Sequence, residues 1–239
     1  MGWLSWLTGA TATRAAERLS PEQREALEAW QRVPEPDLRY SHRQCRYVVV
    51  DVESSGLDTR KDRLISIGAV SVERGMIDLA SAFQVVLRQD RASTTENILL
   101  HGIGASAQME GAEPVEALLS FLDYIGKAPL VAYHAFFDRA MIDKTMRTYL
   151  GAALNRTWID LTWVLPEFFP ARMDGRVPLD DWLNRFDIEV IARHNAVSDA
   201  YATAKLLQIA MARGAQRNAD TPASFIEIES ARRWMFENR

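Results

Sequence analysis

The chain has 239 residues, of which 48% are hydrophobic and 25% are charged, and its formal net charge is −4. This composition excludes a disordered chain and is typical of one globular domain of ordinary size with room for extensions. The negative charge excludes a strongly basic protein that coats nucleic acid, although metal ions can supply local positive charge where an acidic protein binds nucleic acid.

Residues 1–43 are predicted to form a helical N-terminal extension. Ser20 is a suitable N-cap and Pro21 suits the first position of a helix, while the PEPD segment at 34–37 ends it. The main domain is expected over residues 44–214.

Three β-strands are predicted at the start of the main domain. The β-branched run RYVVVDVE at 46–53 is typical of a buried strand, and residues 63–75 alternate between apolar and polar. A third strand, 76–89, follows a turn at Gly75. The short connections favour an antiparallel meander.

Helical periodicity begins after these strands. Residues 113–126 carry apolar side chains at helical spacing, 129–134 form a short apolar strand, and 138–150 continue as a helix. Because the strand at 129–134 is entered from a helix, we expect it to pair parallel to the first strand.

Helices also dominate the rest of the chain. The helix expected over 198–214 has Ser198 as a candidate N-cap and Gly214 as a candidate stop. The remaining helical segments are 157–169, 179–186 and, in a C-terminal tail over 215–239, 223–236. The pattern as a whole predicts an α/β fold with a mixed β-sheet flanked by helices.

Two carboxylates at the end of the first strand require an explanation. Asp51 and Glu53 are two residues apart, so their side chains share one face of the strand. Two like charges this close raise each other's pKa unless a cation lies between them, and a hard divalent ion is the usual partner. A salt-bridged or solvent-facing pair would give the same sequence, so the pair alone is weak evidence.

Two later acids and a histidine lie near the starts of helices. Asp138 follows the apolar strand, and His194 precedes Asp199 by five residues. An acid in the first turn stabilises any helix by about 0.3–1 kcal/mol, so each acid alone also has a structural explanation.

Together, these residues resemble a known family. The patterns D-x-E-x-x-G at 51–56, H-A-x-F-D at 134–138 and H-x-x-x-x-D at 194–199 are similar to those of the DEDDh-type 3′–5′ exonucleases. The best-known members are the proofreading subunit, epsilon, of bacterial DNA polymerase III and related RNA-trimming ribonucleases. The resemblance runs from about Tyr47 to Ala212 and implies a ribonuclease H-like fold.

The resemblance also implies a mechanism. Two divalent cations, Mg²⁺ or Mn²⁺, would flank the scissile phosphate about 3.5–4 Å apart, and the histidine matching His194 would take the proton from the attacking water. The products would be nucleoside monophosphates released from a 3′ end. The implied metal ligands are four carboxylates: Asp51, Glu53, Asp138 and Asp199.

Substrate contacts are expected from two loops. Leu57 and Phe137 are candidates to pack on bases, with ordinary core packing as the alternative. His134 occupies a position where family members usually carry asparagine. His101 is expected to be structural, and His42 is given no role. The full set of candidate substrate residues is Ser54, Ser55, Gly56, Leu57, His134 and Phe137.

The favoured substrate is a single-stranded or frayed 3′ end of DNA. RNA is not excluded as a substrate. Discrimination between DNA and RNA depends on contacts to the 2′-hydroxyl, and the sequence identifies no residue that would make them. The alternatives are an RNA-trimming exoribonuclease of the same family and a non-catalytic scaffold module associated with a polymerase. Association with a DNA polymerase is therefore a further partner hypothesis.

The expected location is the cytoplasm. Cys45 is the single cysteine, which excludes an internal disulfide and fits a reducing compartment. No apolar run approaches the roughly 20 residues that span a bilayer. The apolar start MGWLSWLTGA is short and lacks the basic residues of a signal peptide, so no membrane partner is expected.

Overall fold

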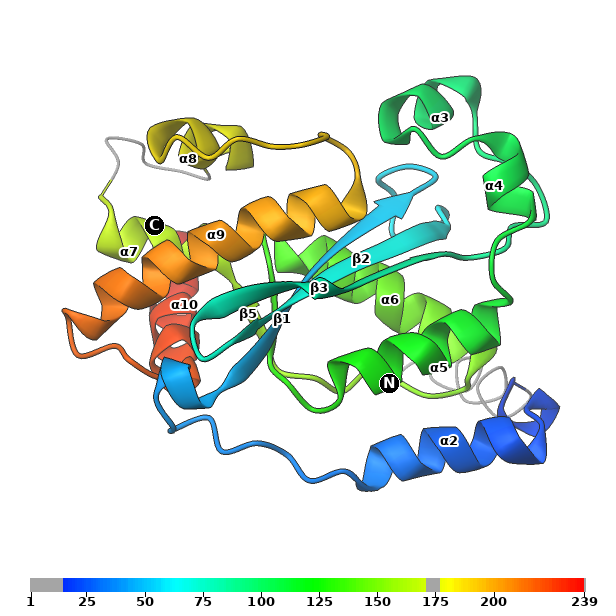
Figure 1. The fold of residues 1–239 in the computed structure, drawn as a ribbon, viewed down its shortest axis with the longest axis horizontal. Coiled ribbons are helices and arrows are strands. Elements are labelled where there is room, and N and C mark those ends of the chain that lie inside the picture. Colours follow the sequence, from blue (N-terminus) through cyan, green and yellow to red (C-terminus); the bar gives the residue numbers. More distant parts are fainter. Residues whose placement is uncertain (1–14, 171–176, 239) are drawn as a thin grey trace.

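A mixed β-sheet forms the centre of the molecule (Figure 1). The computed structural model describes residues 15–170 and 177–238. The sheet has five strands in the order β3-β2-β1-β4-β5. Pairing of β1 with β2 and of β2 with β3 is antiparallel, whereas β1 with β4 and β4 with β5 are parallel. The strands are β1 (Arg46–Ser54), β2 (Leu64–Glu73), β3 (Met76–Val86), β4 (Leu130–Ala132) and β5 (Trp158–Asp160).

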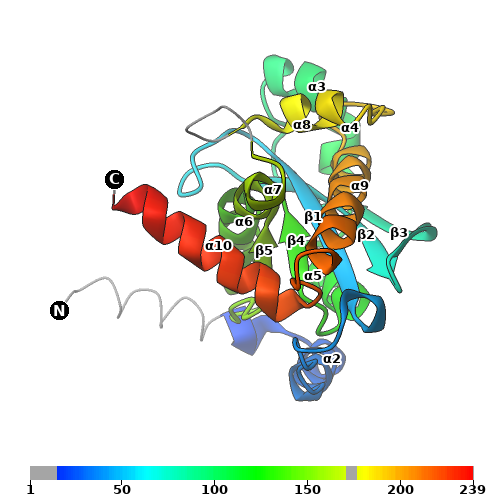
Figure 2. The same ribbon diagram turned by 90° about the vertical axis from the view of Figure 1, so that its left-hand side faces the viewer.

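Helices cover both faces of this sheet (Figures 1 and 2). Helices α5 and α6 pack on one face, α9 crosses the other, and α10 lies against α7 and β5. This arrangement confirms the predicted α/β fold, including the parallel pairing of β1 with β4. The helices are α2 (Pro21–Arg32), α3 (Thr95–His101), α4 (Ala105–Met109), α5 (Pro114–Ile125), α6 (Ala135–Tyr149), α7 (Leu161–Phe168), α8 (Leu179–Arg185), α9 (Ala196–Ala215) and α10 (Pro222–Glu237), with a 3₁₀ turn, η1 (His42–Gln44).

The side chains of β1 alternate between two hydrophobic cores. Val50 and Val52 pack in the core with α5 and α6, whereas Val49 packs in the core beneath α9. Each fully buried valine contributes about 1.5–3 kcal/mol, so the strand is held firmly from both sides. Because successive side chains alternate, Asp51 and Glu53 project toward α9.

The N-terminal helix begins as predicted. Ser20 accepts a hydrogen bond from the main-chain N–H of Gln23 and completes a capping box with it. The helix is docked on the domain because the Trp30 indole N–H donates to the carbonyl oxygen of Gly126 at 2.8 Å, and the Lys127 ammonium lies 3.7 Å from the Trp30 ring centroid. Residues 1–14 lie outside the described part of the chain, and the domain boundaries at 43/44 and 214/215 stay predictions.

One predicted helix was wrong at its start. Residues 157–169 were expected to be helical throughout, but Trp158–Asp160 form β5. The parallel edge of β4 offers hydrogen bonds to this segment, and its apolar side chains are buried there. Helix α7 then begins at Leu161, where the Asp160 carboxylate accepts from the main-chain N–H of Thr162 at 3.0 Å.

The ends of helix α9 also differ from those predicted from the sequence. Helix α9 begins at Ala196 rather than 198, because the Asn195 side chain is the N-cap and accepts from the N–H of Ser198 at 3.1 Å. The predicted stop at Gly214 was also one residue early. A Cβ at Gly214 would lie 2.5 Å from the carbonyl oxygen of Ala219, so this glycine permits close packing of the following turn.

None of the helices in the described part of the chain combines the length and apolar character that a membrane crossing requires.

A buried histidine makes the stability of the fold depend on pH. His42 is 1% exposed, with Nδ1 2.5 Å from the Tyr47 hydroxyl and Nε2 3.2 Å from the carbonyl oxygen of Ala219. Burial lowers the pKa of His42 below its ordinary value, because the charged ring would lose solvation. The folded protein therefore binds this proton less readily than the unfolded chain does.

We expect His42 to reduce the free energy of unfolding as pH falls below about 6.5, the ordinary histidine value. The loss is complete once pH lies below the lowered pKa of the folded state. Urea unfolding at about pH 7.5 and about pH 5 should show a larger decrease for the wild type than for His42→Gln. Equal pH dependence in the two proteins would contradict this role.

Candidate active site

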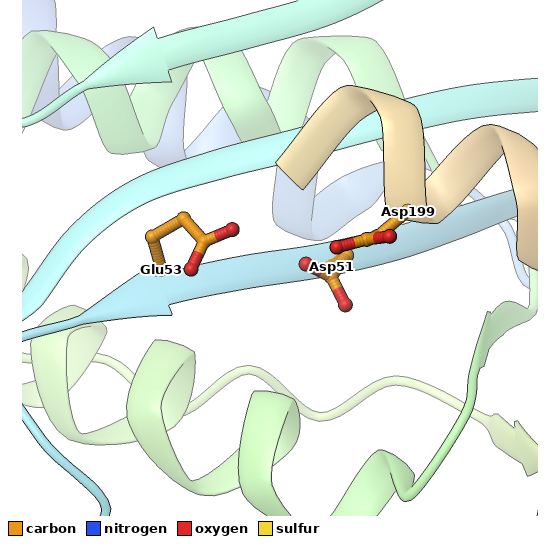
Figure 3. Close-up of side chains that lie close together, drawn as sticks. All are labelled: Asp51, Glu53 and Asp199. Atoms are coloured by element: carbon orange, nitrogen blue, oxygen red, sulfur yellow. The ribbon is translucent and has the colours of Figure 1, made fainter. Parts of the chain in front are cut away.

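Three carboxylates converge at one end of β1. Oxygen atoms of Asp51, Glu53 and Asp199 lie within 4.8 Å of one another. Figure 3 shows the first two on β1 and the third on the facing helix α9. Glu53 and Asp199 are 4% exposed, so the cluster is withdrawn from bulk water. Three negative groups cannot share such a space without a compensating cation or protons.

A glycine allows α9 to approach this closely. Gly68 on β2 pairs directly with Asp51. A Cβ at Gly68 would lie 2.3 Å from the carbonyl carbon of Ala196 and 2.3 Å from the nitrogen of Val197, at the start of α9. The absence of a side chain here therefore brings Asp199, in the first turn of α9, up to β1. Sequence analysis missed Gly68, since its strand pattern alone does not reveal what packs over it.

Asp138 is a further buried acid whose charge acts on the cluster. It lies in the first turn of α6 and is 5% exposed. Burial, and after it repulsion from Asp138, raises the pKa of Asp51 well above its ordinary range. Burial also raises the pKa of Asp138, opposed by hydrogen bonding to main-chain groups of Asp138 and Val52. Asp138 is thus an electrostatic neighbour of Asp51, although it lies outside the tight group of three.

Glu53 provides the test of whether a metal ion fits. Its Oε1 atom is buried without a hydrogen-bond partner among the described residues. Burial, followed by repulsion from Asp199, raises the pKa of Glu53 to about 8, while the Arg193 guanidinium acts in the opposite direction. An unpartnered buried carboxylate oxygen beside two more carboxylates is a donor set that suits a hard divalent cation. The residues present therefore fit the metal that the family implies.

The loop before α9 places two basic residues beside Asp199. Arg193 pairs with Asp199 through Nη1 and with Asp180 through Nε, the latter at 3.0 Å. The main-chain N–H of His194 donates to Asp199 Oδ2 at 2.9 Å. His194 has a φ of 59° and is exposed.

His101 is closer to the cluster than sequence analysis assumed. Its Nδ1 atom lies against Glu53 Oε2, and its ring centroid is 6.3 Å from that of His194. Burial lowers the pKa of His101, and His194 adds to the effect. Sequence analysis gave His101 no place in the site, because its contact with Glu53 joins segments 48 residues apart.

The loop after β1 is held by its own polar groups. Ser54 Oγ donates to the carbonyl oxygen of Gly56 at 2.6 Å, and Ser55 Oγ donates to Asp62 at 2.9 Å. Leu57 is 88% exposed beyond them. The two serines therefore have partners within the loop, and Leu57 is the side chain that projects.

The start of α6 contains the other candidate contacts. Phe137 is half-buried and packs against the hydrophobic core, whereas its neighbour Phe136 is 71% exposed. Adjacent helical residues point about 100° apart, so one faces the core when the other faces solvent. Sequence analysis named Phe137 and missed Phe136.

His134 is exposed and adopts the left-handed conformation, with a φ of 64°, which costs about 1–2 kcal/mol for a residue with a Cβ.

The fold and the cluster define a class: a ribonuclease H-like domain with buried carboxylates suited to divalent cations. A family model described as an exonuclease matches residues 48–207, which is most of the chain. The chain therefore belongs to the exonuclease family, in its DEDDh-type 3′–5′ branch, and the predicted family is confirmed.

Curated relatives include large polymerases. The chain is 30% identical over 162 residues to the DNA polymerase III PolC-type of Bacillus subtilis, covering 67% of this chain and 11% of the polymerase. It is 32% identical over 163 residues to that of Halalkalibacterium halodurans, with the same coverage of 67% and 11%. The chain thus spans about a tenth of the length of these relatives.

Solved structures share the fold. Escherichia coli Exonuclease I in complex with a dA16 oligonucleotide superposes with a TM-score of 0.58 at 17% identity, covering 72% of this chain and 42% of that one. Exonuclease X in complex with 5′ overhanging duplex DNA superposes with a TM-score of 0.56 at 21% identity, covering 77% and 99%.

Proposed function

We propose that this protein is a metal-dependent exonuclease that hydrolyses DNA from the 3′ end to nucleoside monophosphates. The observation that carries the proposal is the convergence of Asp51, Glu53 and Asp199 at the end of β1, with Asp138 as a further buried neighbour of Asp51. Family membership supports the reaction class.

The four acids have separate tasks in this proposal. Asp51, Glu53 and Asp199 would hold one divalent cation, and Asp51 and Asp138 would hold a second. When bound, Mg²⁺ or Mn²⁺ would neutralise charge on the phosphate and make water a stronger nucleophile. The rigid strand beneath Asp51 and Glu53 keeps these ligands in place without a reorganisation step.

His194 is the proposed general base. Its main-chain N–H is bound to Asp199, so the residue is anchored beside a metal ligand while its ring remains exposed. A neutral imidazole there can accept the proton of the attacking water near neutral pH.

The substrate is proposed to be a single-stranded or frayed 3′ end. The exposed side chains of Leu57 and Phe136 are suited to pack on terminal bases, because stacking on apolar groups tolerates any base. Five further residues are proposed to shape the two loops that carry these contacts: Ser54, Ser55, Gly56, His134 and Phe137.

DNA is favoured because the related proteins named above are a DNA polymerase and exonucleases bound to DNA. Association with a DNA polymerase is proposed on the same ground.

The test is digestion of matched DNA and RNA strands, single and duplex, labelled at either end, with Mg²⁺ or Mn²⁺. The proposal expects shortening of DNA from the 3′ end that EDTA stops. Preferential shortening of RNA would instead favour an RNA-trimming enzyme. No EDTA-sensitive cleavage of either, together with stoichiometric capture of a polymerase, would favour a scaffold module.

His194→Ala should slow cleavage by about 10²–10⁴-fold, the usual contribution of a general base. Metal affinity should change little, because the main-chain N–H that binds Asp199 is retained. Calorimetry with Mn²⁺ and single-turnover kinetics measure the two effects separately. A large loss of Mn²⁺ affinity would reject the assigned role.

A further inference from the structure

The turn that leads into α6 is strained and is supported from β5 and from the start of α7. His134 has φ 64° and ψ 45°, a conformation that costs free energy for any residue with a Cβ and persists only where the surroundings enforce it. Its main-chain N–H donates to Asp160 Oδ1 and to Thr162 Oγ1, both at 3.0 Å. Because Asp138 lies in the first turn of α6, the direction in which α6 leaves this turn sets the position of the Asp138 carboxylate.

Asp160 is itself held by the C-terminal helix. Its main-chain N–H donates to Glu229 Oε2 at 2.8 Å. Arg233 Nη2 donates to Glu229 Oε1 at 2.7 Å and lies 3.8 Å from Asp160 Oδ2. The side chains of Asp160 and Glu229 are 5% and 15% exposed, whereas that of Arg233 is 38% exposed. The two carboxylates are therefore shielded from water, and their charge strengthens the hydrogen bonds that they accept.

Helix α10 is anchored at its N-terminal end. Thr221 caps its N-terminus in a capping box with Ser224, and Phe225 is completely buried. The helix begins at Pro222, beyond the residues 48–207 that match the exonuclease family. Glu229 and Arg233 therefore lie outside the matched region, whereas Asp160 lies within it.

We propose that Glu229 and Arg233 are positioning residues for cation binding. They hold Asp160, Asp160 holds the turn at His134, and that turn orients Asp138 relative to Asp51. The proposal rests on the proposed function, because it assigns Asp138 to a cation site. The C-terminal helix would then be required for the metal site as well as for packing.

The experiment compares three variants of the full-length chain. Glu229→Ala removes the contacts of Glu229 with the main-chain N–H of Asp160 and with Arg233. Glu229→Gln retains an oxygen that can accept from the N–H of Asp160. Arg232→Ala is the matched control, because Arg232 lies on the same helix but pairs with Glu167 on α7, at 3.0 Å. The readouts are Mn²⁺ affinity by calorimetry, thermal unfolding, and kcat and KM with a single-stranded DNA substrate.

Glu229→Ala is expected to weaken Mn²⁺ binding by about 10–100-fold, the usual effect of losing a residue that orients a metal ligand. Its kcat should fall by a similar factor while KM changes little. Glu229→Gln should recover most of the affinity. Arg232→Ala should keep wild-type affinity, even where it lowers the temperature of unfolding.

Equal losses of Mn²⁺ affinity in Glu229→Ala and Arg232→Ala would overturn the proposal, since docking of the helix would then be the whole cause. If the wild type cleaves DNA and Glu229→Ala binds Mn²⁺ as tightly as the wild type does, the proposal is also overturned. The proposed function is then left intact. A loss of Mn²⁺ affinity in Glu229→Ala but not in Arg232→Ala supports the proposal even where the wild type cleaves no DNA, because calorimetry measures the cation site directly.

Discussion

Asp51→Asn is expected to reduce hydrolysis at least about 10³-fold, which corresponds to about 4 kcal/mol of lost transition-state stabilisation. Burial raises the pKa of Asp51 most, and its three acidic neighbours, Asp138, Glu53 and Asp199, raise it further. Asp51 is therefore the residue on which both proposed cation positions depend. Single-turnover cleavage of a 3′-labelled oligonucleotide measures the effect.

The same change should stabilise the protein in the absence of metal. Asparagine removes one of several crowded negative groups, so the midpoint of thermal unfolding should rise by about 2–4 °C for each kcal/mol of relieved repulsion. Added Mg²⁺ should raise the midpoint of the wild type but hardly that of the variant, because only the wild type binds the ion tightly. Asp123→Asn, on the exposed surface of α5, is the control and should change neither activity nor the response to Mg²⁺. Retained activity in Asp51→Asn would reject the central role of this residue.

Gly68→Ala should damage the site without touching any acid. The new Cβ would lie 2.3 Å from main-chain atoms of Ala196 and Val197, which cannot move without shifting the start of α9. We expect the free energy of unfolding to fall by about 1–3 kcal/mol, as for other overpacked positions. Asp199 should move away from Asp51, so Mn²⁺ affinity should fall at least about tenfold, by analogy with other losses of ligand positioning.

The control for this change is a second glycine, Gly104, at which an added Cβ would meet no neighbouring atom. A Cβ at Gly104 meets no atom within 4 Å, and its φ is −62°. Gly104→Ala should therefore cost less than about 1 kcal/mol and leave metal binding unchanged. Urea unfolding and calorimetry on both variants test the comparison. Normal Mn²⁺ affinity in Gly68→Ala would show that close approach of α9 is not what assembles the site.

Sequence alone predicted the part of this molecule that depends on local pattern. The β-branched run of β1 and the i, i+2 spacing of Asp51 and Glu53 were sufficient to place both acids on one face. The change from strand to helix periodicity predicted the order of elements, and the parallel pairing of β1 with β4 followed from it. The resemblance of the later motifs to the exonuclease family indicated which distant acids to group with this pair.

Features that depend on tertiary contacts were not predictable. The need for glycine at position 68 appears only when the start of α9 is seen above it, and the link from Glu229 to Asp160 joins segments 69 residues apart. Short helices such as α3 and α4 lack the length for a clear periodicity. The three-residue strand β5 was read as helix because its apolar residues run straight into α7.

The most direct test is anomalous diffraction from crystals of the wild-type protein grown with Mn²⁺ and a short DNA strand. The account predicts two peaks about 3.5–4 Å apart, one among Asp51, Glu53 and Asp199 and the other between Asp51 and Asp138. Mn²⁺ bound elsewhere on the protein, with no peak among these carboxylates, would contradict it.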